Sequence, residues 1–140
     1  MYRKIDHVGI AVRSIEEALR LYSGLGFQVD HIEEVGEQKT RVAMLPVGES
    51  RLELLESTEP DSPIARFISK RGEGLHHITF QVDDISEELI RLRAAGIRLI
   101  DEIPRTGADQ CLVAFIHPSS TGGVLVELSQ PKSATSRIGD

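Results

Sequence analysis

Residues 5–27 read IDHVGIAVRSIEEALRLYSGLGF, and residues 75–97 read LHHITFQVDDISEELIRLRAAGI. At a constant offset of 70 positions the two stretches align without a gap, and His7 meets His77. The likeness continues downstream, where Val-Ala-Met-Leu is matched by Val-Ala-Phe-Ile and Leu-Glu-Leu by Val-Glu-Leu. The chain therefore holds two copies of one pattern, each of roughly 55–60 residues.

Each copy predicts the same order of elements. Its first segment alternates, with Val8, Ile10 and Val12 on one face, which is typical of a half-buried strand. A helix follows, because Ser14 and Asp84 each precede a glutamate by three residues, as helix caps do. Three short strands should complete each copy, near residues 27–33, 40–46 and 51–56, and near 97–102, 112–117 and 124–129.

The order β-α-β-β-β, read twice, predicts an α+β fold of two tandem βαβββ modules within a single domain, residues 1–140. Module one should span about 4–57 and module two about 75–130. Residues 58–74 predict a connecting helix, and we expect the polar residues 131–140 to be a frayed tail.

Composition limits the function. The net charge is −6, the isoelectric point is about 5.4, and lysines and arginines cluster no further than pairs, which argues against a nucleic-acid partner. No apolar run approaches the about 20 residues that cross a membrane, and the N-terminus does not resemble a signal peptide. We therefore expect no membrane partner and a cytoplasmic location. One cysteine, Cys111, rules out an internal disulfide.

Two kinds of chemically informative residue recur at equivalent positions of the copies. His7 matches His77, and Glu53 matches Glu127, each glutamate lying inside an apolar strand where an unpaired carboxylate is costly. A lone histidine or glutamate of this kind is usually a packing or solvent-facing residue. Two copies packed about a pseudo-twofold axis would instead bring two imidazoles and two carboxylates together. That set suits a divalent metal with positions left open for substrate.

The remaining histidines, the cysteine and the acidic residues give weaker indications of function. His76 adjoins His77 but should point to the opposite face, as a packed or supporting residue. His31 and His117 should lie near loops, and Cys111 should be an ordinary buried thiol. The acidic residues between positions 33 and 37 suggest a solvated loop.

With these residues in view, the chain resembles the vicinal oxygen chelate superfamily. Within it, the chain is similar to the methylmalonyl-CoA epimerase family. The resemblance covers roughly residues 4–130, and its most specific segments are Asp-Ser-Pro-Ile at 61–64 and Gly-Glu-Gly-Leu-His-His at 72–77. It implies a vicinal oxygen chelate-type fold with a central metal cleft.

The resemblance also implies a function. His7, Glu53, His77 and Glu127 match the metal ligands of the family. The metal would be a divalent ion, cobalt first, with manganese, nickel and zinc as alternatives. The substrate would be an acyl-CoA, methylmalonyl-CoA, whose α-carbon is inverted between the 2R and 2S forms. Members are typically homodimers.

Inversion is simplest with two bases on opposite sides of a planar intermediate. Some members carry a free glutamate in the third strand, where this chain has Val42. We therefore expect Glu127 and Glu53 to be the catalytic bases, with a metal-bound water as the alternative to Glu53. The loop at Asp109, Gln110 and Cys111 also differs from the His-Gly-Lys of many relatives, so the residues that bind CoA are left unassigned.

Two other functions stay open on the sequence alone. A glyoxalase I-like lyase acting on a glutathione hemithioacetal could use the same four ligands. A metal-free small-molecule binding protein could use the same fold.

Overall fold

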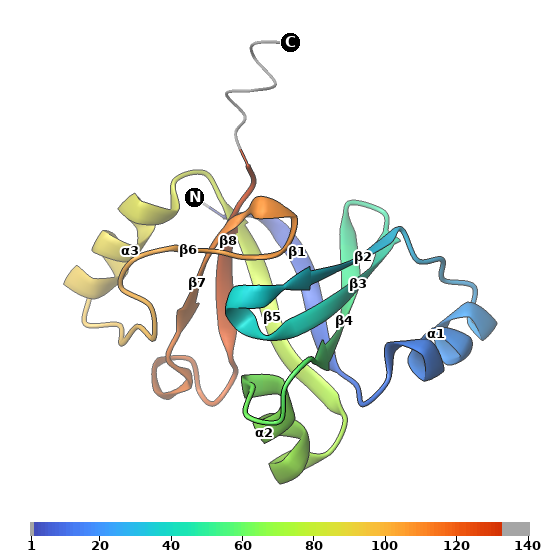
Figure 1. Ribbon diagram of the computed structural model, residues 1–140. Helices are drawn as coiled ribbons and strands as arrows, with labels where there is room; N and C mark the ends of the chain where they lie inside the picture. Colours follow the sequence, from blue (N-terminus) through green and yellow to red (C-terminus); the bar gives the residue numbers. More distant parts are fainter. Residues whose placement is uncertain (1, 133–140) are drawn as a thin grey trace.

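The computed structural model describes residues 2–132 and shows a single curled sheet with three helices against it (Figure 1). Most of the predicted frayed tail, from residue 133 onward, lies outside the described residues. No helix within residues 2–132 is both long enough and apolar enough to span a bilayer.

The elements follow the repeated order. The first half contains β1 (Tyr2–Ala11), α1 (Ile15–Gly24), β2 (His31–Val35), β3 (Thr40–Val47) and β4 (Ser50–Ser57). The helix α2 (Pro63–Arg71) follows, within the predicted connecting segment. The second half contains β5 (Gly74–Val82), α3 (Ile85–Ala94), β6 (Arg105–Thr106), β7 (Leu112–Ile116) and β8 (Val126–Gln130). We propose that the module boundary falls between β4 and β5.

All eight strands form one mixed sheet in the order β2-β3-β4-β1-β5-β8-β7-β6. The first strands of the two halves, β1 and β5, are antiparallel neighbours at its centre. Each also pairs in parallel with the last strand of its own half, β1 with β4 and β5 with β8. Equivalent positions of the two halves therefore meet across the β1–β5 pair.

Side-chain caps set the first residues of α1 and α3, and glycines follow their last turns. The side chains of Ser14 and Asp84 accept hydrogen bonds from backbone N–H groups three residues on, as their sequence predicted. Gly26 and Gly96 follow α1 and α3 with φ of +104° and +82°, a backbone region that glycine adopts without strain.

Apolar packing fixes the helices on the sheet. Ile15 of α1 packs with Val12 and Leu54, and Ile85 of α3 packs with Val82 and Leu128. Ile64 of α2 joins a third cluster inside the curl of the sheet. Burying each such side chain contributes about 1.5–3 kcal/mol. The packing holds the strands, and with them the side chains on the inner face, in fixed register.

Two predicted strands differ from the structure. The strand expected at 27–33 begins at His31, because the Phe27 N–H instead donates to the carbonyl of Tyr22 and closes α1. The strand expected at 97–102 is reduced to one isolated bridge at Leu99. There the carboxylate of Asp101 accepts the N–H of Phe115 at 2.9 Å, which takes a donor that the sheet ladder needs.

The two edges of the sheet meet in space. Asp109 follows β6, and its backbone N–H donates to Oε1 of Glu33 on β2 at 3.0 Å. The edge strands are therefore brought together although they stand at opposite ends of the strand order, and the sheet is strongly curled (Figure 1). Glu33 and Glu34 both belong to β2, and the expectation of a solvated loop was wrong for these two residues.

Candidate metal centre and substrate cavity

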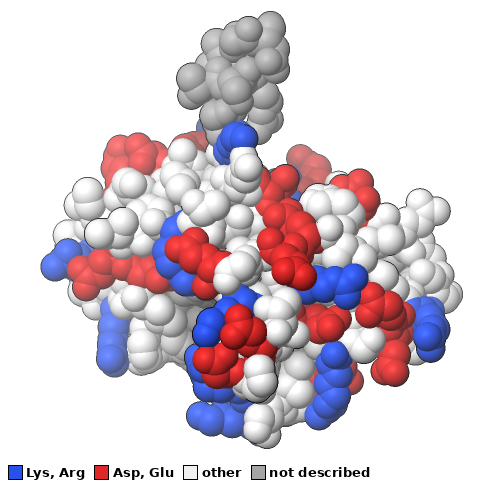
Figure 2. All heavy atoms as spheres, in the orientation of Figure 1, with Lys and Arg blue, Asp and Glu red and all other residues white. Residues whose placement is uncertain are grey.

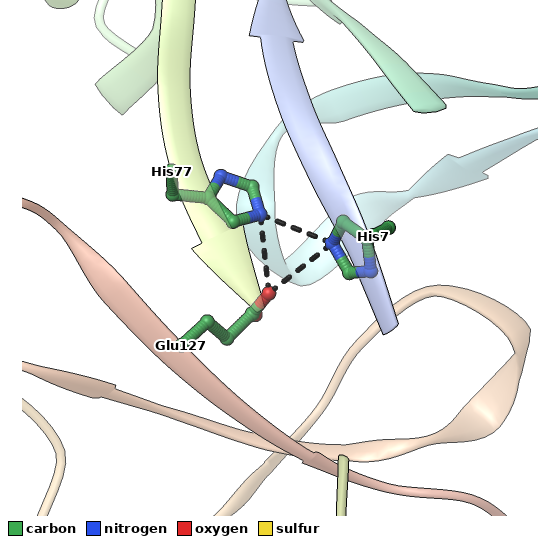
Figure 3. Close-up of side chains that lie close together, drawn as sticks. All are labelled: His7, His77 and Glu127. Atoms are coloured by element: carbon green, nitrogen blue, oxygen red, sulfur yellow. Dashed lines mark hydrogen bonds and ion pairs between the residues drawn. The ribbon is translucent and has the colours of Figure 1, made fainter. Parts of the chain in front are cut away.

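Three of the predicted ligands converge on the inner face of the central strands. His7 lies on β1, His77 on β5 and Glu127 on β8, and Figure 3 shows the three side chains pointing toward one another. The pairing of β5 with both β1 and β8 sets this arrangement. The three residues are only 5%, 7% and 5% exposed.

The spacing of the three donor atoms suits a metal ion. Nε2 of His7 lies 3.1 Å from Nε2 of His77. Oε1 of Glu127 lies 3.2 Å from Nε2 of His77 and 3.5 Å from Nε2 of His7. Metal–ligand distances of about 2.0–2.2 Å separate adjacent ligand atoms by about 2.8–3.1 Å in octahedral and about 3.3–3.6 Å in tetrahedral coordination. The donors are thus spaced as one face of such a polyhedron.

Glu53, the fourth predicted ligand, lies on the other side of the His7 ring. Its Oε2 is 3.3 Å from Nδ1 of His7 and accepts a hydrogen bond of 2.8 Å from Nε of Arg51. The structure therefore groups His7, His77 and Glu127 at one nitrogen of His7, and Glu53 at the other. Arg51 was not singled out by the sequence.

Asp6 also contacts His7. A shift in the β1–β5 register passes over Asp6, and this bulge lets its carboxylate reach Nδ1 of His7 at 2.8 Å. Burial raises the pKa of Asp6, but the contacts with His7 and Arg51 outweigh it and hold the pKa below its usual value. A carboxylate on Nδ1 fixes the orientation of the ring and leaves Nε2 free for a ligand.

The protonation of the cluster follows from its carboxylates. Burial lowers the pKa of His7, but Glu53, Asp6 and Glu127 outweigh it and raise the pKa to about 10. Burial likewise raises the pKa of Glu127, whereas hydrogen bonds from the imidazoles of His7 and His77 bring it well below the usual range. The neighbouring carboxylates therefore favour the protonated form of the His7 imidazole.

His76 contacts His77 directly, and the prediction that it faces away was wrong. A second register shift passes over His76, since Gly9 pairs with His77 and Ile10 with Leu75. The extra residue breaks the alternation of faces, and Nδ1 of His76 lies 2.9 Å from Nδ1 of His77. Burial, with the neighbouring His77, lowers the pKa of His76 to about 4, so that its ring is neutral at pH 7.

Thr79 completes the cluster and was not identified from the sequence. It is fully buried, and its hydroxyl donates to Oε1 of Glu127 at 2.6 Å while lying 3.0 Å from Nε2 of His7. It occupies the position of module two that corresponds to Gly9 in module one. Its place on the same strand face as His77 was the available signal.

Replacing Thr79 with valine should lower the free energy of unfolding by about 1–3 kcal/mol, because the buried carboxylate of Glu127 loses a donor. Urea denaturation of the purified variants measures the change. Thr79→Ser, which keeps the hydroxyl, should lose less, and the exposed Thr106→Val provides the control. A Thr79→Val protein as stable as the original would contradict the role given to this hydrogen bond.

Gly9 leaves the room that His77 occupies. A Cβ at this position would lie 2.3 Å from Cε1, 2.5 Å from Nδ1 and 2.9 Å from Nε2 of His77. On another side the ring meets the edge of Phe115, at 5.6 Å between centroids. The position of this imidazole therefore depends on a residue without a side chain.

The cluster opens into a cavity of about 450 Å³, a volume within the range of small-molecule sites. Its apolar wall comes from both halves and includes Val42, Leu55, Ile64 and Phe115. Val42 lies on this wall, so β3 presents an apolar side chain and no carboxylate at that position. Cys111 is a buried thiol on the same wall, and burial raises its pKa.

Charged groups also line the cavity. The cationic ones are Lys39, Arg51, Arg66 and Arg105. Lys39 pairs with Asp61 at 3.0 Å, and Arg105 lies 3.2 Å from Asp101. Figure 2 shows acidic and basic side chains interspersed over the face that carries α2 and the β2–β3 hairpin.

Two other histidines lie apart from the cluster. His117 caps a short 3-10 helix, where its Nδ1 accepts the N–H of Ser119 at 3.0 Å. His31 is the first residue of β2, beside the loop that precedes this strand, and it pairs with Asp30 and Glu33.

The fold and the site define a class of protein. The model of the glyoxalase/bleomycin resistance protein/dioxygenase superfamily matches residues 6–115. The chain therefore belongs to this superfamily.

Relatives define the family more narrowly. The uncharacterized protein YqjC of Bacillus subtilis is 47% identical over 92% of this chain and 93% of its own length. Human mitochondrial methylmalonyl-CoA epimerase is 39% identical over 91% of this chain and 73% of its own. A variant of Streptomyces coelicolor methylmalonyl-CoA epimerase, solved with 2-nitronate-propionyl-CoA, superimposes with a TM-score of 0.91. It is 36% identical over 95% of this chain and 97% of its own. Within the superfamily, the chain belongs with the methylmalonyl-CoA epimerases.

Proposed function

We propose that this protein is a metal-dependent epimerase that inverts the α-carbon of methylmalonyl-CoA between its 2R and 2S forms. The observation that carries the proposal is the convergence of His7, His77 and Glu127 at the wall of a cavity, in a chain of this family. The names of the relatives favour this reaction over a glyoxalase I-like lyase. The donor set favours it over a metal-free binding protein.

The charges support a divalent cation. Three buried carboxylates, those of Asp6, Glu53 and Glu127, stand with the guanidinium of Arg51, which leaves two net negative charges when the histidines are neutral. A cation held by His7, His77 and Glu127 would balance them. Glu53 would become the fourth ligand if its side chain left Arg51. Nitrogen and oxygen donors suit cobalt, and also manganese, nickel and zinc.

When bound, the cation supplies electrostatic stabilisation of the negative charge that develops as a carbon acid next to a thioester loses its proton. Glu53 and Glu127 then carry the proton transfers. Their carboxylates contact opposite nitrogens of the His7 ring and both line the cavity, so they approach a substrate from different sides. One of the two takes the α-proton as a carboxylate. The other, protonated from solvent before the step, donates its proton to the opposite face, and proton exchange with solvent then resets both groups.

The cavity suits an acyl-CoA. Its apolar wall excludes water around the reacting carbon, which strengthens the electrostatic interactions there. The basic side chains of Lys39, Arg66 and Arg105 also line it and can pair with the phosphates of CoA. The homodimer and the cytoplasmic location stay predictions.

Solvent deuterium uptake tests the function. Chelator-treated protein would be reloaded with cobalt, manganese, nickel or zinc in turn, and deuterium at the α-carbon of methylmalonyl-CoA followed by mass spectrometry. We expect uptake only with a restored metal. Uptake without metal would remove the cation from the mechanism. If the protein turned over a glutathione hemithioacetal but not methylmalonyl-CoA, the proposed function would be that of a glyoxalase I-like lyase.

Glu53→Gln should keep the bound metal but lose turnover by about 10²–10⁴-fold, because an amide cannot accept the proton. Metal content by mass spectrometry and epimerisation rate are measured on the same preparation. Glu34→Gln, which removes an exposed carboxylate of β2, is the control. An undiminished rate in Glu53→Gln would exclude Glu53 from proton transfer.

A further inference from the structure

The two candidate metal-binding histidines are supported in equivalent ways by different residues. Asp6 and His76 stand one position before His7 and His77, and they are related by the same offset of 70. Both fall at register shifts of the central β1–β5 pair. Each bulge turns the preceding side chain toward its neighbour, with Asp6 on Nδ1 of His7 at 2.8 Å and His76 on Nδ1 of His77 at 2.9 Å.

The contact between the two Nδ1 atoms requires one proton between them. A neutral imidazole carries its proton on one nitrogen and accepts with the other. Nε2 of His77 is the atom that faces His7 and Glu127, so a cation bound there leaves the proton of His77 on Nδ1. Nδ1 of His76 must then be the acceptor, and the proton of His76 must be on its own Nε2.

Neighbouring rings hold the imidazole of His76 in the orientation that this hydrogen bond to His77 requires. Phe67, on α2, packs edge-on against it with centroids 4.9 Å apart and planes at 79°. On the other side the rings of His76 and His77 are nearly perpendicular, at 87°. The connecting helix therefore positions His76, and through it one donor of the cluster.

An imidazole also suits the charge of the site. Asp6, Glu53 and Glu127 with Arg51 already supply two net negative charges. A carboxylate in place of His76 would add a third within a buried cluster, at a high cost in desolvation. A neutral acceptor orients the ring of His77 without changing that balance.

We propose that His76 is a positioning residue whose Nδ1 accepts the Nδ1 proton of His77 and so presents Nε2 of His77 to the cation. The inference rests on the cation site of the proposed function. It assigns to His76 in module two the part that Asp6 has in module one. Groups that orient a metal-binding histidine typically contribute about 10–100-fold to metal affinity.

Zinc affinity tests the proposal without any acyl-CoA. Isothermal titration of the chelator-treated full chain should give a dissociation constant about 10–100-fold weaker for His76→Leu than for the original. His76→Gln, whose amide oxygen can accept the same proton, should recover most of the loss. His117→Gln, which removes a histidine distant from the cluster, should bind as the original does. Equal zinc affinity in His76→Leu and the original would overturn the proposal.

Nitrogen-15 NMR of the zinc-loaded original protein gives a second readout that needs no variant to fold. We expect a proton on Nε2 of His76, none on its Nδ1, and a slowly exchanging proton on Nδ1 of His77. A proton on Nδ1 of His76 would overturn the proposal even with zinc bound. Failure of the original chain to bind zinc would instead remove the cation site, and the proposed function with it.

Discussion

Replacing Gly9 with alanine is expected to lower metal affinity and epimerisation by more than about 100-fold each, without a direct change to any ligand. The added methyl would stand 2.3 Å from Cε1 of His77, so the ring has to move. Phe115 and His76 restrain it on other sides, and the displacement carries Nε2 away from its partners. Overpacking should also cost about 1–3 kcal/mol of stability.

Gly24→Ala is the matched control for this substitution. Gly24 ends α1, and a Cβ there meets nothing within 4 Å. Alanine in a helix is favoured over glycine by roughly 0.5–1 kcal/mol, so this variant should be as active and at least as stable as the original. Metal titration and thermal unfolding of both variants separate a local displacement from misfolding. A Gly9→Ala protein that binds metal like the Gly24→Ala protein would refute the prediction.

Glu127→Gln should have the second large effect, a loss of turnover of about 10³-fold or more together with weakened metal binding. The substitution keeps the shape of the side chain but removes its charge. It thereby removes the anionic donor beside both imidazoles and one of the two proposed bases. Rates are measured at saturating metal, so that weak binding alone does not account for the loss.

Comparison with Glu53→Gln gives this prediction its sharpest form. Glu127 lies beside the Nε2 atoms of His7 and His77, which face each other, whereas Glu53 lies beside Arg51. Loss of Glu127 should therefore reduce both metal content and turnover, and loss of Glu53 should reduce turnover alone. A Glu127→Gln protein that retains a bound metal and turns over within about tenfold of the original would show that neither role belongs to Glu127.

Much of the fold could be predicted, because the two copies carry the same periodicity and the same caps. The alternation around His7 and the caps at Ser14 and Asp84 predicted strands and helices that the structure contains. The equivalence of His7 and His77 also indicated which residues meet, since duplicated strands pair across a pseudo-twofold axis.

The parts that could not be predicted depend on local breaks in the pattern. The bulges at Asp6 and His76 reverse the face that strict alternation assigns, and a bulge has no sequence signal in these stretches. The strand expected around Leu99 fails because the side chain of Asp101 takes a backbone donor. Such competition becomes visible only when the partner strand is in place.

The other omissions depend on side-chain contacts, and two of these contacts join residues far apart in the chain. Gly9 matters because His77 lies against it, and Thr79 because Glu127 accepts its proton. Arg51 holds Glu53 at Nδ1 of His7, on the far side of that ring from His77 and Glu127. The register of the central strands brings the first two pairs together, whereas Arg51 and Glu53 meet as i and i+2 neighbours on one face of β4.

The position of the cluster at the junction of the two halves has a thermodynamic consequence. His7 comes from one half, and His77 and Glu127 come from the other. An ion that binds only the folded chain raises its unfolding free energy, by about 4.1 kcal/mol at a thousandfold excess over the dissociation constant. A bound cation would thus link the two repeats. The same few side chains would then serve both catalysis and the stability of the fold.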